Sequence, residues 1–375
     1  MLNYEFPPLG GGGGVAAKKL AIGFIKAGYE VDYVTTWFTG LKEYELVDDI
    51  NIYRVKVIGR KELPTATMLS LLSFPVNAYK KTKELCERND YKFVLSYFTV
   101  PSGTLGRKIA KKYNLFHIVN IVGGDIYDPT KKLSPHKNFF FRKEVERVLK
   151  SADKIVSISN DTITRLNTYY KNDKTVIPIA IPYEPFKFKP ASRKSLGLKD
   201  DLFYTITVGR LVKRKGIDFL IRSIAQLNNK KVHALVLGDG PEKDNLLALA
   251  KQLKVQNQIH FLGSQSEEKK FQYLHSSDIY LLSSVHEGFG IVLQEAMQAG
   301  LPIIATNNGG QVDILKDSLN GYLIDYNDTH HLTESLKFLI DNPSIRTKMS
   351  NYNLNDIENY SLDKITNQYL RLVKR

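Results

Sequence analysis

Two short stretches in the second half of the chain combine residue types that suit an anionic ligand. The stretch TITVGRLVKRKG (205–216) ends an apolar run in glycine and then offers Arg210 and Lys215. A guanidinium binds a diphosphate through a fork of donors, and an ammonium binds it as a compact charge. Ligands of open α/β sheets lie at the carboxyl ends of strands, which is where we expect these two cations.

The second stretch, SSVHEGFGIVLQEAMQAG, carries Glu287 and Glu295 eight positions apart. Between them, Gly288, Phe289 and Gly290 precede a predicted helix, whose unpaired N–H groups favour phosphate binding. Carboxylates accept hydrogen bonds from hydroxyls, so we expect one glutamate to hold a ribose and the other a hexose. A purely structural alternative remains open, in which Glu287 caps the helix and Glu295 pairs with a lysine.

Glycine-rich loops also end predicted strands elsewhere in the chain. The run Gly10–Gly14 precedes a helix predicted over 15–27, and Asp125 follows a glycine pair in NIVGGDIYDP. Glycine loses more backbone entropy on folding than any other residue. Five in succession are therefore either slack or a surface that a ligand approaches closely; for a close approach two or three glycines are sufficient, and the others would be slack.

The elements that would position these loops alternate between strands and helices. In the first half, apolar runs such as YKFVLSYF and FHIVNIV are separated by predicted helices, for example at 102–113 and 138–151. In the second half, LFYTITVG, VHALVLG and LPIIAT continue this alternation. Apolar runs interleaved with helices are typical of buried parallel sheets, so we expect an α/β fold. Only six residues precede the first proline pair, so the first strand is expected to be short.

The length of 375 residues exceeds the size at which single cores stop growing, which predicts two domains. A proline-rich segment, PIAIPYEPFKFKP, is expected to connect them. We predict an N-terminal domain over 1–182, a C-terminal domain over 183–352, and a C-terminal helix in 353–375 that returns to the first domain. The chain has a single cysteine, and its sequence shows neither an apolar stretch long enough to span a membrane nor a signal peptide. These features favour a cytoplasmic location.

The net charge of +14 is concentrated in the first half of the chain. Residues 1–190 hold 30 Lys and Arg against 19 Asp and Glu, a surplus of 11, whereas the remainder has a surplus of 3. A solvated surface and an anionic membrane surface both explain this excess. A nucleic-acid partner is disfavoured because no motif for one is found. Residues 63–82 fit either an interfacial membrane segment or a helix packed on its own sheet.

Taken in order, PPLGGGG, VGRLVKRKG, LGDGPE, HEGFGIVLQEAMQAGLPIIAT and NNGGQVDIL resemble the retaining glycosyltransferases of family four, the glycosyl transferases group 1. The resemblance covers nearly the whole chain. It implies the GT-B fold, with two facing Rossmann-like domains, parallel sheets and a cleft between them. It also implies transfer of a hexose from a nucleotide diphosphate sugar to a saccharide or lipid-linked acceptor in cell-envelope glycan synthesis, with retention of the anomeric configuration.

The same resemblance assigns roles to residues. Arg210 and Lys215 would bind the donor diphosphate, Glu295 the nucleotide ribose and Glu287 the donor sugar. The backbone N–H groups of residues 288–290 would contact sugar hydroxyls and phosphate.

In the first half, Gly11 and Gly12 would lie beside the phosphates. Many relatives carry His-Gly-x-Asp where this chain has Val122 and, three residues later, Asp125. Asp125 therefore joins Glu287, Lys215 and Arg210 as a catalytic candidate.

No cofactor and no metal are expected. The chain has no Asp-x-Asp motif and no His/Cys cluster with ligand spacing, so lysine and arginine would take the place of a cation. Two other classes remain open: a nucleotide-sugar epimerase or phosphorylase on the same fold, and a basic non-catalytic module that binds an anionic polymer or membrane.

Overall fold

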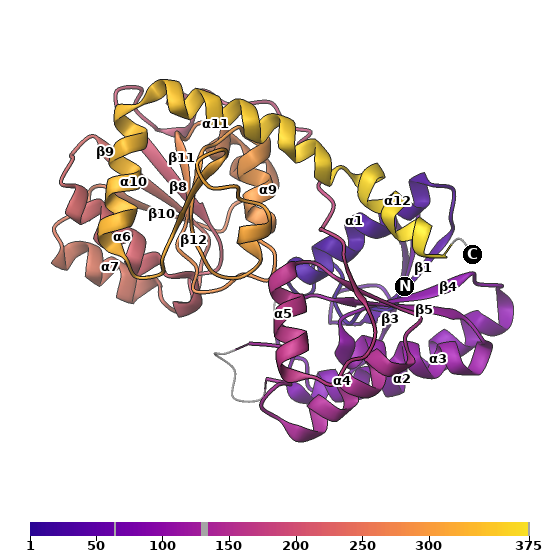
Figure 1. Cartoon of the computed structure of the whole chain (residues 1–375). Helices are drawn as coiled ribbons and strands as arrows, with labels where there is room; N and C mark the ends of the chain where they lie inside the picture. Colours follow the sequence, from indigo (N-terminus) through magenta and orange to yellow (C-terminus); the bar gives the residue numbers. More distant parts are fainter. Residues whose placement is uncertain (64, 129–133, 374–375) are drawn as a thin grey trace. The chain divides into compact units, whose positions relative to one another are not determined.

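The computed structural model describes residues 1–63, 65–128 and 134–373 and divides the chain into two compact units (Figure 1). The first unit is Met1–Glu184 with Tyr360–Arg375, and the second is Pro185–Asn359. The sequence-based boundaries at 182 and 352 lie two and seven residues before these. The larger difference arises because helix α11 (Pro343–Asp356) runs through residue 353 without a break.

The sheet of the first unit follows the predicted α/β pattern, with one addition. Its strands are β1 (Val31–Thr36), β2 (Tyr44–Val47), β3 (Ile50–Val55), β4 (Phe93–Tyr97), β5 (Phe116–Ile121), β6 (Lys154–Ser157) and β7 (Val176–Pro178). The pairing orders are β1-β3-β2 and β4-β5-β6-β7. Leu2 joins the two by parallel bridges to Val34 and Ser96, so the first strand is indeed short. The addition is β2, which pairs antiparallel with β3 through a turn at Asp48 and Asp49.

Helices α1 (Gly12–Lys26), α2 (Met68–Arg88), α3 (Thr104–Tyr113), α4 (Phe139–Ser151), α5 (Asn160–Tyr169) and α12 (Leu362–Val373) complete the first unit. Helix α3 packs against both α2 and α4, so these three form one layer beside the sheet (Figure 1). Helix α12 packs on α1, where the rings of Phe24 and Tyr369 lie 6.3 Å apart. The C-terminal helix therefore belongs to the first unit.

The second unit has one sheet of six parallel strands in the order β10-β9-β8-β11-β12-β13. They are β8 (Phe203–Val208), β9 (Val232–Leu237), β10 (Ile259–Gly263), β11 (Ile279–Leu282), β12 (Ile303–Thr306) and β13 (Gly321–Ile324). The strand order reverses between β8 and β11, and such a switch point opens a crevice at the carboxyl ends of the two strands. The predicted α/β class with parallel sheets is confirmed.

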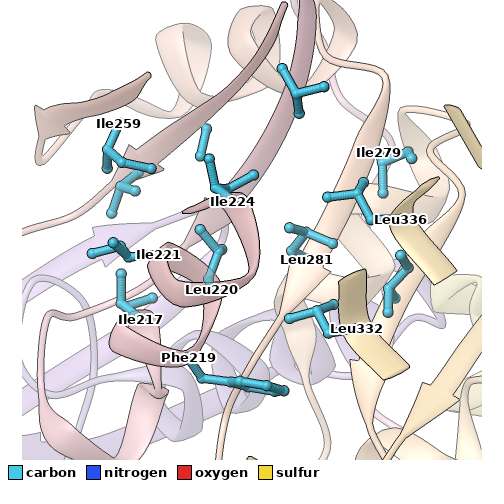
Figure 2. Packing of buried hydrophobic residues seen from close by; sticks show 14 of the residues in the cluster. Ile217, Phe219, Leu220, Ile221, Ile224, Ile259, Ile279, Leu281, Leu332 and Leu336 are labelled. Atoms are coloured by element: carbon cyan, nitrogen blue, oxygen red, sulfur yellow. The ribbon is translucent and has the colours of Figure 1, made fainter. Parts of the chain in front are cut away.

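Helices α6 (Ile217–Leu227), α7 (Lys243–Gln252), α8 (Glu267–His275), α9 (Ile291–Gln298), α10 (Thr329–Asp341) and α11 surround this sheet. The main core lies between the sheet and helices α6 and α10 (Figure 2). Leu220 and Ile224 of α6 meet Leu332 and Leu336 of α10 there, all at most 2% exposed. This packing fixes β8 and β11, whose loops form the site below. Among the residues described, no helix is both long and apolar enough to cross a membrane.

Candidate functional site

The two predicted stretches meet at the switch point of the second sheet. The loop after β8 forms a single helical turn, η3 (Lys213–Lys215), and ends at Gly216, which has a φ of +59°. A Cβ on Gly216 would lie 2.2 Å from the carbonyl oxygen of Ser283, so only glycine allows the two loops to approach this closely. The Val285 N–H donates to the Arg214 carbonyl at 2.8 Å and joins the loops directly.

Glu287 is the centre of a buried ionic cluster in these loops. Lys215 Nζ and the Ser284 hydroxyl each lie 2.6 Å from its Oε1, and an Arg214 guanidinium nitrogen lies 3.4 Å from its Oε2. Burial alone would raise the pKa of Glu287, but the charges of Lys215 and Arg214 outweigh it and lower the pKa to about 2. The carboxylate is therefore ionised at neutral pH, and the cluster carries a net positive charge.

A third loop fixes the backbone of Glu287. Gly309, after β12, forms a parallel bridge with Glu287, and the Gly310 N–H donates to the Glu287 carbonyl at 2.7 Å. Gly309 has a φ of +95°, and a Cβ on it would lie 2.5 Å from that carbonyl oxygen. The glutamate thus stands on a backbone held by the loops after β8, β11 and β12.

Glu295 lies within α9 and pairs with a lysine. Lys270 of α8 lies 2.7 Å from its Oε1 and also pairs with Glu267 at 2.9 Å. The other oxygen, Oε2, is buried and has no hydrogen-bond partner within the described part of the chain. The lysine pair agrees with the structural alternative for Glu295, whereas Glu287 does not cap α9, whose N-cap is Gly290.

The two glutamates lie near a common side chain. Burial raises the pKa of the Tyr280 phenol, and the negative charges of Glu295 and Glu287 raise it further. Both carboxylates are therefore within electrostatic reach of one phenol on β11. The eight-residue spacing brings them to the same region of the unit.

The glycine turn between them begins α9 as predicted. Gly290 has a φ of +97° and is the N-cap of the helix, and Phe289 is 2% exposed. Within the described residues, Gly288 and Gly290 donate no backbone hydrogen bond to another residue. These two N–H groups, beside the positive end of the helix dipole, are available to the oxygen atoms of a ligand.

Arg210 shares a loop with Lys215 but takes no part in the ion pairs of the cluster. Its side chain is exposed, and it forms no ion pair with any residue that the structure describes. Its predicted role in binding a diphosphate remains a prediction.

The glycine run of the first unit is packed against the unit's own side chains. A Cβ on Gly10 would lie 2.3 Å from Glu5 Cδ, and one on Gly13 would lie 2.3 Å from Phe98 Cζ. Gly11 has nothing within 4 Å of such a Cβ, and its N–H donates to Glu5 Oε2 at 3.2 Å. Gly10 and Gly13 are therefore not slack, because a side chain at either position would have to displace Glu5 or Phe98.

Gly12 is the first residue of α1, directly after the Gly11 N-cap. The Glu5 carboxylate therefore already occupies the start of this helix, and burial raises its pKa. The placement of phosphates beside Gly11 and Gly12 remains a prediction.

Asp125 is held by backbone donors from two loops. Its Oδ2 accepts from the Thr99 N–H at 2.6 Å and its Oδ1 from the Val122 N–H at 3.0 Å. The carboxyl group is buried, and burial raises its pKa. Both oxygens fasten the loops after β4 and β5, and a catalytic role for Asp125 remains a prediction.

Family models cover both units. The model of Glycosyltransferase Family 4 matches residues 10–184, and the model of Glycosyl transferases group 1 matches residues 188–356. The chain is a glycosyltransferase of this family. Its two matched regions correspond to the two units of the structure, and the resemblance read from the sequence is confirmed.

Relatives of this glycosyltransferase align with all or with about half of its length. An uncharacterized glycosyltransferase of Methanocaldococcus jannaschii is 26% identical over 100% of the chain and 97% of its own. A lipopolysaccharide core biosynthesis glycosyltransferase of Rhizobium meliloti, LpsE, is 31% identical over 48% of the chain and 52% of its own.

Two solved structures share the fold. Sucrose-phosphate synthase from Thermosynechococcus elongatus matches with a TM-score of 0.84 and 19% identity over 96% of the chain and 92% of its own. HepE of Anabaena, in complex with UDP-glucose, matches with a TM-score of 0.76 and 16% identity over 98% of the chain and 97% of its own. These likenesses show the GT-B fold.

Three contacting residues of the glycosyltransferase were not among the sequence-based candidates: Arg214, Ser284 and Lys270. Arg214 and Ser284 lie inside the quoted motifs, so their proximity to Lys215 and Glu287 was a signal that could have been used. Lys270 lies 25 positions before Glu295, and nothing in the local sequence marks the pair. Among the described residues, no group of three His, Cys, Asp or Glu side chains could hold a metal ion.

Proposed function

We propose that this glycosyltransferase moves a hexose from a nucleotide diphosphate sugar to a hydroxyl group, with retention of the anomeric configuration. The observation that carries the proposal is the buried Lys215–Glu287 pair, 2.6 Å apart, at the strand ends where α9 begins. A cation for phosphate and a carboxylate for sugar hydroxyls lie side by side there. The likeness of fold to HepE, solved with UDP-glucose, supports a donor of this class.

The donor would be held at its phosphates and at both of its sugars. Lys215 and Arg210 bind the diphosphate, together with the N–H groups of Gly288 and Gly290. Glu287 accepts from the hexose hydroxyls, and Oε2 of Glu295, which has no partner within the described residues, accepts from the ribose. Each contact matches a donor to an acceptor.

In the reaction, the bond between the anomeric carbon and the phosphate oxygen breaks as positive charge grows on the sugar. The acceptor oxygen bonds to the same face, and its proton passes to the departing phosphate. Lys215, Arg210 and the start of α9 stabilise the negative charge of the leaving group from fixed positions. Because these groups supply the positive charge, we propose that the reaction needs no metal.

The acceptor is proposed to be a saccharide or lipid-linked glycan of the cell envelope, reached at the cytoplasmic face of a membrane. The role of the relative LpsE in lipopolysaccharide core biosynthesis supports this acceptor class. The layer of α2, α3 and α4 supports the proposed contact with a membrane, because these helices carry twelve Lys and Arg against four Asp and Glu. Anionic lipids attract such a surface.

The outer side of α2 adds an apolar component to this basic layer. Leu69, Leu72 and Val76 are 61%, 53% and 68% exposed, opposite the buried Phe74 and Ala78. One turn after these exposed apolar residues, at position 80, the same side of the helix carries a lysine. A helix that is apolar at one end and basic at the other fits the boundary between headgroups and acyl chains.

A thermal-shift panel of nucleotide sugars, followed by transfer assays, tests the proposal. Nucleoside diphosphates and their sugars should raise the melting temperature in a concentration-dependent way. Glu287→Ala and Lys215→Ala should abolish transfer while circular dichroism shows a folded chain. Full activity of both variants would remove these residues from the mechanism.

The products separate this proposal from other enzymes on the same fold. An epimerase would return a nucleotide sugar with an altered hexose, and a phosphorylase would release sugar phosphate from an oligosaccharide and inorganic phosphate. The proposed transferase releases a nucleoside diphosphate.

A further inference from the structure

Arg214 is attached to the Glu287 loop at three points. Its guanidinium Nη1 donates to the His286 carbonyl at 2.8 Å and lies 3.4 Å from Glu287 Oε2. Its own carbonyl accepts from the Val285 N–H at 2.8 Å. The guanidinium is thus held by a backbone carbonyl independently of the carboxylate, and the residue's own backbone is tied to the same loop.

Lys215 and Arg214 hold different oxygens of Glu287. Lys215 and the Ser284 hydroxyl share Oε1, whereas Arg214 alone of the described side chains approaches Oε2, and at the longer distance. The Lys215 side chain passes over Gly209, because a Cβ on Gly209 would lie 3.3 Å from Lys215 Cε. The lysine ammonium is a compact charge on a flexible stem. The lysine can therefore turn towards a second anion, and the arginine stays in place.

We propose that Arg214 is a positioning residue that holds Glu287 when Lys215 turns to the donor diphosphate. The inference rests on the proposed function, in which Lys215 binds phosphate and Glu287 binds the donor sugar. The long contact at Oε2 leaves that oxygen able to accept a hydrogen bond from a sugar hydroxyl. Arg214 then provides the counter-charge that the lysine gives up.

Removing Arg214 would affect the transition state more than the free enzyme or the donor complex. In the free enzyme, Lys215 still pairs with Glu287, and in the donor complex it can share its charge between the carboxylate and the diphosphate. As the negative charge of the departing diphosphate grows, it draws Lys215 away, and a buried carboxylate would be left with only the Ser284 hydroxyl; a buried charge without a counter-charge is costly. Because this cost arises in the transition state and not on donor binding, the loss is expected in kcat and not in the KM for the donor.

The test compares Arg214→Gln and Arg214→Lys with Lys213→Gln in the full chain. Lys213 lies in the same helical turn, is exposed, and makes no ion pair within the described residues, so its variant removes an equal charge away from Glu287. Release of nucleoside diphosphate from a nucleotide sugar is followed over a range of donor concentrations up to saturation, which gives both kcat and the donor KM. Arg214→Gln should lower kcat about tenfold or more, since hydrogen bonds to charged groups contribute that much, with donor KM changed by less than about threefold.

The pH profile of kcat distinguishes positioning from a general loss of structure. Lys215, Arg214 and the Ser284 hydroxyl contact the Glu287 carboxylate, the Tyr280 phenol is within its electrostatic reach, and His286 precedes it in the chain. Loss of the arginine charge should move the acidic limb of the profile upwards, because one of the two charges that lower the pKa of Glu287 is removed. Arg214→Lys should restore the limb and most of kcat, and Lys213→Gln should match the wild type.

The outcomes separate this inference from the proposed function. If Arg214→Gln shows the wild-type kcat and pH profile while Glu287→Gln is inactive, the role of Arg214 is overturned and the proposed function stands. Activity in Glu287→Gln would overturn the proposed role of Glu287 and this inference with it. If Arg214→Gln does not fold, Arg214→Met, which also removes the charge, decides: a lowered kcat at an unchanged melting temperature supports the role, and an unchanged kcat overturns it.

Discussion

Replacing Glu287 with Gln removes the negative charge between Lys215 and Arg214 and keeps the shape of the side chain. The wild-type carboxylate is only 11% exposed, and its two cationic partners are 13% and 34% exposed. Solvent therefore screens this cluster weakly, and the charge makes a measurable contribution to the stability of the second unit.

The lowered pKa of Glu287 gives the size and the sign of that contribution. A shift from 4.5 to about 2 corresponds to about 3 kcal/mol in favour of the ionised, folded state. Because the pKa is depressed on folding, this stability is complete above pH 4.5 and is lost as the pH falls through 2. The stability difference between wild type and Glu287→Gln should be about 3 kcal/mol at pH 6 and less than half of that at pH 3.

Urea unfolding followed by far-ultraviolet circular dichroism at both pH values measures this difference. Comparing the two proteins at the same pH cancels the titration of all other groups. Hydrogen exchange of a peptide covering residues 283–300 assigns the loss to the second unit. A stability difference that is equal at pH 6 and pH 3, or absent at pH 6, would refute the electrostatic account of the cluster.

Three further predictions follow from the fold and the proposed function. Leu72→Glu and Val76→Glu should reduce binding to vesicles that contain anionic lipid. The control Leu247→Glu, which changes a 44% exposed leucine of the second unit, should not reduce it. Sedimentation with vesicles measures the binding, and equal binding by all variants would exclude α2 as the contact. Gly216→Ala should destabilise the second unit by about 1–3 kcal/mol because of its φ and the Ser283 carbonyl, and an unchanged urea midpoint would contradict this. Transfer activity should persist after dialysis against EDTA. If activity is lost on dialysis and returns when Mg²⁺ or Mn²⁺ is added, a metal takes part in the reaction.

The sequence predicted features that depend on neighbouring residues along the chain. The glycine at 290 and the apolar stretch after it predicted the start of α9, and the parallel sheet follows from apolar runs between helices. The link between Lys215 and Glu287 was accessible too, because both residues follow central strands of one sheet. The order of motifs along the chain and the positions of the strand ends were therefore sufficient to predict which loops form the site.

Features set by distant contacts were not predicted. The space beside Gly13 is filled by Phe98, and the oxygen of Glu295 is held by Lys270, and neither pair is marked in the local sequence. The antiparallel strand β2 is short and half exposed, so it lacks the apolar run that identified the other strands. These contacts depend on how elements pack, which periodicity and motif spacing do not specify.

Hydrolysis of a nucleotide sugar in the absence of acceptor tests the central claim most directly, with water taking the place of the acceptor hydroxyl. The wild-type protein should release a nucleoside diphosphate and a free hexose whose anomeric configuration, read by proton nuclear magnetic resonance before mutarotation, is that of the donor. Glu287→Gln should release neither. Release of a nucleoside monophosphate with a sugar phosphate, an inverted hexose, or full activity in Glu287→Gln would contradict the account.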